Sequence, residues 1–363
     1  MKFRCEREVL NEAFNATSRA ASNRGTNPTL SCVRLVLAGE SLRVTGTDGD
    51  LTIDSSITVS NGKDGVVLVP GKLIADVVKS LPSGAVDFEV VEDKVEISAG
   101  RVNFNVPIGA GDDFPKWSGT VGEGAPMSAP EFAEALRQVV RAASTDDARG
   151  VYTGVFMTGV DGKLRMVATD SYRMAIRDID ASVIPDGKSV VVPARALSEL
   201  LRLLDRQERV SMNITENDVT FEAGSTRLVT RLLTGSFADY QRLIPPNLPN
   251  TLTVAREPLT EAIRRVKLVA RDPIGTPLRM QISGIAVTLR MITPDNGEAT
   301  EQIDATHAGN DIEIRFNNEM LTQGLEACGT DDVTIQTSEP SKLAVIKGVG
   351  QPNFTYLLMP LKS

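Results

Sequence analysis

The chain has 363 residues, of which 41% are hydrophobic and only 4% aromatic, and its formal net charge is −8. So few aromatic side chains argue against a stacking platform for single-stranded bases, and the acidic balance argues against a surface that attracts polyanions everywhere. Cys5, Cys32 and Cys328 are far apart and form no CxxC pair, which argues against a disulfide framework or a zinc site. Because no apolar run reaches 18 residues and no signal segment opens the chain, we expect a cytoplasmic protein without a membrane partner.

In the first third of the chain the sequence predicts two helices. Short strands are predicted between them and after the second one. Residues 7–24 and 71–81 each repeat apolar side chains at the i, i+3, i+4 and i+7 positions of a one-faced helix, as Leu10 and Phe14 illustrate. Short β-branched runs bounded by Gly, Asp or Asn predict strands at residues 35–37, 42–45, 52–59, 66–69, 86–91, 95–98 and 102–106.

The second third follows a Gly- and Pro-rich linker, residues 119–128. Ser128, with Pro130 in the first turn and Glu131 three residues on, predicts a capping box that opens a helix over residues 130–149. A second helix is expected at residues 193–206. The strands predicted for this third lie at residues 154–157, 164–168, 189–192, 210–214 and 219–222.

The last third begins after a stiff, proline-rich connector at residues 245–250. Its first helix is predicted at residues 256–272, and a second one carries Leu321, Leu325 and Cys328 on its apolar face. The strands predicted here lie at residues 280–282, 287–290, 312–315, 333–337, 343–347 and 356–359.

The three thirds are repeats of one unit, because their helices recur with the same apolar pattern at offsets of roughly 120 residues. A period of this length indicates tandem whole domains, which we place at residues 1–120, 121–250 and 251–363. Each is expected to be an α+β domain in which two helices pack on one face of an antiparallel sheet.

No set of residues in the sequence predicts an active site. The single histidine, His307, lies in a polar segment without a serine or cysteine nucleophile nearby, and a surface loop is its expected setting. The segments 47–50 and 111–113 lack the ligand spacing of a calcium loop, and residues 109–111 lack the glycines of a phosphate loop, so all three are expected to be turns. We therefore expect no catalytic residue, no metal and no cofactor.

Basic residues gather on the predicted helices although the chain is acidic. Five helical windows with 80 residues together carry a charge of +4, so the other 283 residues carry −12. A solvated charged face is the alternative for each helix taken alone. Because equivalent helices share the feature, it predicts a surface that meets phosphates without reading bases. The residues expected to face DNA are Arg24, Lys72, Lys79, Arg137, Arg141, Arg195, Arg202, Arg206, Arg264, Lys267 and Arg271.

Several motifs in combination resemble a known family. They are the opening Met1-Lys-Phe with Glu6-Arg-Glu8, the segment Thr169-Asp-Ser-Tyr-Arg-Met-Ala175, the segment 235–245 with Asp239 and Arg242, and the ending Tyr356-Leu-Leu-Met-Pro-Leu361. Together they resemble the bacterial DNA polymerase III beta subunit, the replication sliding clamp, over essentially the whole chain. The chain departs from the family pattern at Ser171 and Tyr172, where Gly-His is common, and at Gly275, where some members have an aromatic residue.

The resemblance implies a DNA clamp fold and a head-to-tail homodimeric ring of six domains around double-stranded DNA. It implies a processivity factor that binds DNA nonspecifically and tethers the DNA polymerase III alpha subunit. The clamp loader and other polymerases and repair proteins would also bind, through short peptides. By motif, the peptide pocket would use Arg149, Tyr152, Thr169, Arg173, Met174, Arg242, Leu243, Asn317, Met320, Met359, Pro360 and Leu361. The dimer interface would use Phe104, Val106, Leu268 and Val269.

Two other functions remain open from the residues alone. An oligomeric scaffold that does not bind DNA would share the fold, and a neutral or acidic helix surface would distinguish it from a clamp. An enzyme of unknown class is the second alternative, although the lone histidine and the missing phosphate loop count against it.

Overall fold

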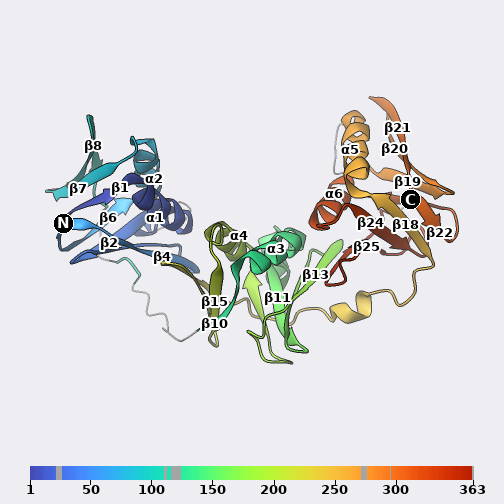
Figure 1. Ribbon diagram of the computed structural model, residues 1–363, viewed down its shortest axis with the longest axis horizontal. Coiled ribbons are helices and arrows are strands. Elements are labelled where there is room, and N and C mark those ends of the chain that lie inside the picture. Colours follow the sequence, from blue (N-terminus) through green and yellow to red (C-terminus); the bar gives the residue numbers. More distant parts are fainter. Residues whose placement is uncertain (22–26, 110–112, 116–123, 271–275, 295, 362–363) are drawn as a thin grey trace. The chain divides into compact units, whose positions relative to one another are not determined.

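The computed structural model describes residues 1–21, 27–109, 113–115, 124–270, 276–294 and 296–361 (Figure 1). The chain divides into two compact units. The first comprises Met1–Pro130 with Arg195–Leu232, and the second comprises Glu131–Ala194 with Leu233–Ser363.

One chain path, a strand, a helix and then three strands, occurs six times along the chain. Each of the three sequence repeats therefore contains two copies of a smaller motif, and helices start about every 60 residues. The copies of the first repeat are β1 (Lys2–Glu6), α1 (Arg7–Ala20), β2 (Cys32–Ala38), β3 (Ser41–Thr47) and β4 (Leu51–Thr58), then β6 (Gly65–Pro70), α2 (Gly71–Ser80), β7 (Ala85–Val91), β8 (Lys94–Ala99) and β9 (Val102–Pro107).

The second and third repeats follow the same path. The second has β10 (Ala125–Ser128), α3 (Ala129–Val139), β11 (Gly154–Val160), β12 (Lys163–Thr169), β13 (Arg173–Ile179), β14 (Ser189–Pro193), α4 (Ala194–Leu203), β15 (Arg209–Ile214), β16 (Asp218–Ala223) and β17 (Thr226–Arg231). The third has β18 (Asn250–Ala255), α5 (Arg256–Val266), β19 (Leu278–Ser283), β20 (Ala286–Thr293), β21 (Gly297–Asp304), β23 (Ile312–Phe316), α6 (Asn318–Ala327), β24 (Asp332–Thr337), β25 (Ala344–Gly348) and β26 (Phe354–Leu358).

Short additional elements join these copies. They are the strands β5 (Ser60–Lys63) and β22 (Thr306–Ala308) and the 3₁₀ turns η1 (Pro28–Ser31), η2 (Val140–Ala142), η3 (Asp147–Thr153), η4 (Tyr240–Leu243) and η5 (Lys267–Val269).

The two copies of each repeat exchange their first strands, so that the first strand of one copy pairs in the sheet of the other. β1 pairs with β7 of the second copy, while β6 pairs with β2 of the first, and the other two repeats exchange strands in the same way. The first unit thus holds the sheets β5-β1-β7-β8-β9 and β10-β15-β16-β17-β4-β3-β2-β6. The second unit holds β14-β11-β12-β13-β26-β25-β24-β18-β22 and β21-β20-β19-β23.

Two sheets are continuous across repeats. In the first unit β4 pairs with β17, and in the second unit β13 pairs with β26 in register, so that Met174 lies opposite Leu357. In the first and third repeats the two helices lie together, since α1 packs on α2 and α5 on α6 (Figure 1). The α+β organisation with helices on antiparallel sheets, expected from the sequence, is confirmed.

The core of the first unit shows how the helix pattern produces packing. Leu10, Ala13 and Phe14 of α1 are buried against strands from both copies. The rings of Phe3 and Phe88 stack with their centroids 4.6 Å apart. Fully burying side chains of this size contributes about 1.5–3 kcal/mol each, which fixes the helix on the sheets.

We predict that Gly46→Ala in β3 destabilises the first unit by about 3 kcal/mol or more. A Cβ at this position would lie 1.9 Å from the carbonyl oxygen of Thr17 in α1, and backbone cannot move aside as a flexible side chain could. Thermal unfolding followed by calorimetry tests this, with Ser41→Ala at the exposed start of the same strand as the control. An unchanged melting profile for Gly46→Ala would contradict this account of the packing.

Several predicted boundaries differ from those observed. The helix expected over residues 130–149 ends at Val139, and η2 and η3 follow it. The helix expected to 272 ends at Val266, so Lys267, Leu268 and Val269 lie on η5. The predicted linker 119–128 ends in the strand β10, which pairs with β15.

His307 was predicted to lie in a surface loop, and this is wrong. It is half-buried on β22, opposite Leu252 of β18, and its Nε2 is buried without a hydrogen-bond partner. The turn predicted around Asp48 is confirmed, because its carboxylate accepts hydrogen bonds from the backbone N–H groups of Asp50 and Leu51 at 3.0 and 2.8 Å.

Candidate nucleic-acid and partner sites

Six of the basic residues expected to face DNA make no ion pair within the part of the chain that the structure describes. They are Lys72, Lys79, Arg137, Arg202, Arg206 and Lys267. All are exposed except Lys267, which is half-buried on η5. Long cationic side chains of this kind can contact a phosphate backbone without fixing its position.

Three other basic residues of that set are engaged with carboxylates. Arg195 at the start of α4 lies 2.7 Å from Asp48. Arg141 on η2 lies 3.1 Å from Glu326 of α6, and Arg264 of α5 lies 3.4 Å from the same carboxylate. Two further predicted residues, Arg24 and Arg271, lie outside the described residues.

The residues predicted to form the peptide pocket all lie in the second unit, on or next to η3, β12, β13, η4, α6 and the end of β26. The turn between β12 and β13 is held by Asp170, whose Oδ1 accepts hydrogen bonds from the N–H groups of Tyr172 and Arg173, each at 3.0 Å. The buried Thr169 donates its hydroxyl to the carbonyl oxygen of Arg173 at 2.6 Å. Ser171 adopts a φ of 75°, a conformation that favours glycine, so the hydrogen bonds of the turn offset local strain.

The chain end forms one wall of this region. The N–H of Met359 donates to the carbonyl oxygen of Tyr172, and that of Leu361 donates to the carbonyl oxygen of Arg315, both at 2.8 Å. Met359 is 42% exposed, and Tyr172 and Leu243 are also exposed apolar groups. Pro360 and Leu361 are half-buried. The end of the chain therefore offers apolar side chains to solvent while its backbone is fixed.

Aromatic side chains gather near Arg149, another residue of the predicted pocket. The guanidinium of Arg149 lies 5.7 Å from the ring centroid of Tyr152, and its Nη2 donates to Ser171 Oγ at 2.6 Å. Tyr152 contacts Phe237, which stacks on Phe156. Sequence reasoning did not identify Phe237 as part of the site, although it lies inside the family segment 235–245.

Arg173, another residue of the predicted pocket, makes several contacts within the second unit. Its side chain is only 11% exposed, and its Nε lies 3.0 Å from Asp170. Its remaining nitrogens donate to Gln323 of α6 and to the backbone carbonyl of Arg141. The guanidinium thus joins β13 to α6, and its contact with a partner peptide stays a prediction.

Other predicted pocket residues have structural roles of their own. Asn317 caps α6, because its Oδ1 accepts hydrogen bonds from the N–H groups of Glu319 and Met320, each at 3.0 Å. The carbonyl of Met320 accepts the hydroxyl of Tyr356, and burial raises the pKa of that hydroxyl to about 12. Met174 is buried in a cluster with Tyr240 and Leu357, so little of its side chain can contact a peptide. Arg242 is exposed and lies 2.8 Å from Asp239.

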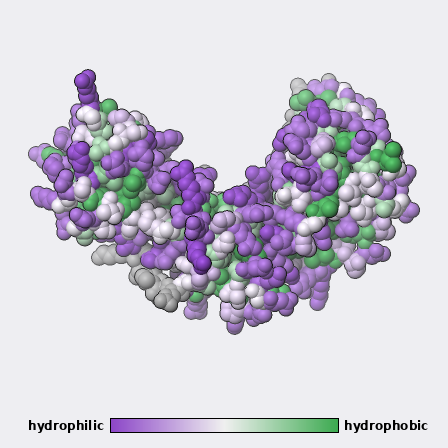
Figure 2. All heavy atoms as spheres, in the orientation of Figure 1, coloured by the Kyte–Doolittle hydropathy of each residue, from purple (hydrophilic) through white to green (hydrophobic). Residues whose placement is uncertain are grey.

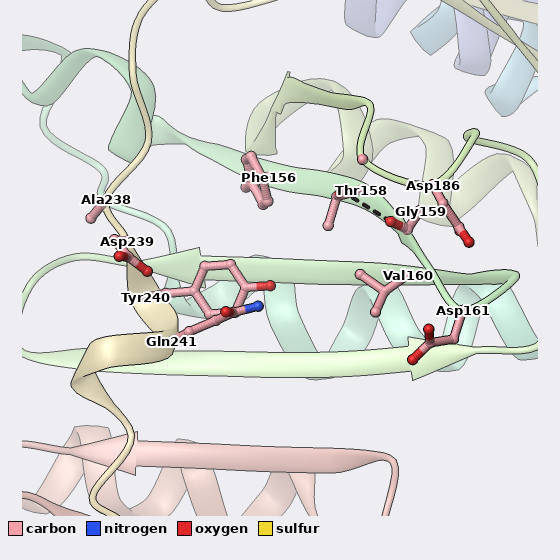
Figure 3. Close-up of a pocket in the computed structure, with 11 residues that line it drawn as sticks. Phe156, Thr158, Gly159, Val160, Asp161, Asp186, Ala238, Asp239, Tyr240 and Gln241 are labelled. Atoms are coloured by element: carbon pink, nitrogen blue, oxygen red, sulfur yellow. Dashed lines mark hydrogen bonds between the residues drawn. The ribbon is translucent and has the colours of Figure 1, made fainter.

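A separate groove of about 500 Å³ lies beside η4 (Figure 3). Figure 3 shows Phe156 and Tyr240 in the groove, with the carboxylates of Asp161 and Asp186 beyond them. On the same sheet, the Asp178 carboxylate raises the pKa of Arg165 and binds it at 2.7 Å. No sequence motif predicts this groove, because its lining comes from β11, the turns at Asp161 and at Asp186, and η4 with the two residues before it.

Among the residues that the structure describes, we find no reactive thiol and no metal site. Burial raises the pKa of all three cysteines, to about 12 for Cys328, so they remain protonated thiols near neutral pH. Within the described ranges, no group of three or more His, Cys, Asp or Glu side chains could hold a metal ion, and no helix is long and apolar enough to cross a membrane. Hydrophilic residues cover most of the visible face of both units (Figure 2).

The residues predicted for a dimer interface lie near two free sheet edges. Among the described residues, β9 pairs only with β8 and β21 only with β20, so each presents backbone groups without a strand partner there. Leu268 is 83% exposed, Val269 is half-buried and Phe104 is half-buried on β9. Val106 is 2% exposed and packs in the core of the first unit, and its place in an interface stays a prediction.

Comparison with known proteins gives the family of the chain. Models of the N-terminal, central and C-terminal domains of the DNA polymerase III beta subunit match residues 1–118, 127–239 and 241–362. A Beta sliding clamp of Synechocystis sp. is 31% identical over 389 residues, covering 100% of this chain and 99% of that protein. A Beta sliding clamp of Staphylococcus aureus is 27% identical over 375 residues, covering 100% of both.

Solved structures agree with these relatives. The DnaN sliding clamp (DNA polymerase III subunit beta) from Bartonella birtlesii, bound to griselimycin, is 29% identical with a TM-score of 0.93, and 100% of each chain is covered. The corresponding clamp from Pseudomonas aeruginosa is 27% identical with a TM-score of 0.92 over 100% of both chains. The chain therefore belongs to the DNA polymerase III beta subunit family, the sliding clamps.

Proposed function

We propose that this chain uses three surfaces to act as a clamp: a helix surface toward DNA, an interface between two copies, and a pocket for partner peptides. As a family member it is a DNA sliding clamp, a non-catalytic processivity factor of DNA polymerase III. The observation that carries this function is the match of three family models along nearly the whole chain. We further propose three domains, at residues 1–120, 121–250 and 251–363.

The surface toward DNA comprises the basic residues of the helices. Six of them have no carboxylate partner among the described residues, and such cations attract phosphates at a distance without reading bases. The alternative function, a scaffold that does not bind DNA, would need a neutral or acidic helix surface. Exposed cations on α2, α3 and α4 favour the clamp.

The dimer is proposed to join the first domain of one copy to the third domain of its partner. Free edges at β9 and β21 and the exposed Leu268 support this placement. Because the two surfaces differ, the contact is head-to-tail, and two copies close it into a ring. A ring of two three-domain chains holds six domains.

Partner peptides are proposed to bind the pocket of the second unit. Leu243, Met359 and Leu361 would supply apolar contacts, with Tyr172 and Arg149 beside them. The partners would be the polymerase alpha subunit, the clamp loader, and other polymerases and repair proteins. A small groove gains its affinity from a few buried anchor residues. We therefore expect a micromolar dissociation constant, which is a binding free energy of about −8 kcal/mol.

We predict that retention on DNA depends on topology. Free association with linear duplex should be weak and steeply salt-dependent, with a dissociation constant of about 10⁻⁴ to 10⁻⁶ M, because only nonspecific phosphate contacts are made. Protein loaded on a nicked circle should stay until the circle is cut, as measured by co-elution with DNA in gel filtration. Rapid dissociation of the protein from an intact circle at moderate salt would contradict retention by topology.

A further inference from the structure

Of the α-helices in the described part of the chain, α6 alone carries no basic residue. Its charged residues are Glu319 and Glu326. Glu319 lies in the first turn, where the helix dipole favours an acid. Glu326 lies in the last turn, where the dipole opposes one, so its presence needs another cause.

That cause is visible in the contacts of the Glu326 carboxylate. Its Oε2 lies 3.1 Å from Nη1 of Arg141, and its Oε1 lies 3.4 Å from Nη2 of Arg264. The arginines come from two different segments, η2 and α5, and both belong to the surface proposed to face DNA. One carboxylate thus occupies two of the cations that would otherwise bind phosphate.

We propose that Glu326 is a positioning residue that holds Arg141 and Arg264 in exchangeable ion pairs, and so limits how tightly the clamp grips DNA. The inference rests on the proposed DNA-facing surface. Phosphates must displace the carboxylate before either arginine binds them. As the clamp moves, each arginine exchanges a weak contact with a phosphate for a weak contact with the carboxylate. This exchange lowers the free-energy barrier to sliding along DNA.

The ion pairs suit such an exchange because they are exposed. The side chains of Arg141 and Arg264 are more than half exposed, and that of Glu326 is 36% exposed. Pairs in such a solvated setting are weak and easily screened. Arg264 also lies 2.5 Å from Glu261, so it keeps a second carboxylate when Glu326 is displaced.

The backbone at Arg141 is fixed, so only its side chain needs to move. Its carbonyl oxygen accepts a hydrogen bond from Nη2 of Arg173 at 2.5 Å, and Arg173 is itself bound to Asp170. The guanidinium of Arg141 can therefore change partners without a shift of η2.

The test compares Glu326→Gln with Glu134→Gln in the full-length dimer. Glu134 is exposed on α3, has no ion pair among the described residues, and carries the same charge, so the two variants change the net charge equally. Binding to a short fluorescent duplex is measured between 50 and 200 mM salt, roughly the range over which counterion release is resolved. Diffusion of loaded clamps on stretched DNA is measured in parallel.

We expect Glu326→Gln to bind the duplex about tenfold more tightly at low salt, against about twofold or less for Glu134→Gln. Its salt slope should steepen by about 1, because Arg141 loses its carboxylate partner while Arg264 keeps Glu261, and its diffusion should slow. Equal affinities, slopes and diffusion for the two variants would overturn the inference.

A third variant separates this inference from the proposed function. Arg264→Gln should weaken duplex binding if the surface contacts DNA. If it does so while Glu326→Gln behaves like Glu134→Gln, the DNA surface stands and the role of Glu326 is wrong. If Arg264→Gln, Arg141→Gln and Glu326→Gln all bind like the parent protein, the proposed surface is wrong and the inference fails with it.

Discussion

Replacing Leu268 with lysine is expected to convert the dimer into monomers and to abolish retention on circular DNA. Leu268 is 83% exposed on η5 and lies off the apolar face of α5 that packs into the domain. Burying a leucine at an interface contributes about 1.5–3 kcal/mol. Placing an unpaired ammonium there costs more, because the charge loses its hydration. Sedimentation at micromolar concentration measures the oligomeric state.

Ile285→Lys is the matched control for this variant. Ile285 is 82% exposed and belongs to the same repeat, but it lies in the turn between β19 and β20. The other end of β20 contacts η5, where the hydroxyl of Thr293 donates to the carbonyl of Val269. We expect Ile285→Lys to remain dimeric. A Leu268→Lys protein that stays dimeric would show that the interface is elsewhere.

The sequence predicted the helices and most of the strands because their signals are local. All six helices carry an apolar stripe at helical spacing, and the strands it identified are β-branched and bounded by turn residues. Their boundaries were less accurate where a helix passes into a 3₁₀ turn. Residues 140–142 and 267–269 still satisfy the helical apolar pattern, so periodicity alone does not reveal the change.

Several strands were missed, and for β13 and β21 the reason is that they lack an alternating apolar pattern. β21 is exposed or half-exposed along its whole length because it lies at a sheet edge, and it therefore shows no alternation. β13 is buried on both faces in its centre and has charged residues at its ends, so it also lacks the period of two. The exchange of first strands between copies was not predictable either, since pairing partners depend on the whole fold and not on local pattern.

The peptide pocket was predicted through motifs, and motifs do not distinguish contact residues from those that support them. Thr169, Arg173 and Asn317 all occur in the predicted set. Each is engaged in hydrogen bonds that hold a turn or a helix start. By contrast, Leu243, Met359 and Tyr172 expose apolar surface. Affinity for partner peptides is therefore expected to depend on the second group, and the shape of the pocket on the first.

Deleting residues 359–363 is expected to abolish both peptide binding and polymerase stimulation while leaving the dimer intact. The deletion removes the exposed side chain of Met359, that of Leu361, and the two backbone hydrogen bonds that fix the chain end to Tyr172 and Arg315. Loss of two apolar anchors of about 1.5–3 kcal/mol each would raise a micromolar dissociation constant to the millimolar range. Titration of a labelled peptide from the polymerase tail measures this.

Two further variants make the result specific to the pocket. Met359→Ser keeps the backbone hydrogen bonds and should lose part of the affinity, because one anchor is removed. Val349→Ser, at an apolar residue that is 48% exposed and follows β25, should bind like the parent protein. Sedimentation should show dimers for all three variants, since the chain end lies outside the proposed interface of β9, β21 and Leu268. Equal peptide affinity for the parent and the deletion variant would mean that partners bind elsewhere.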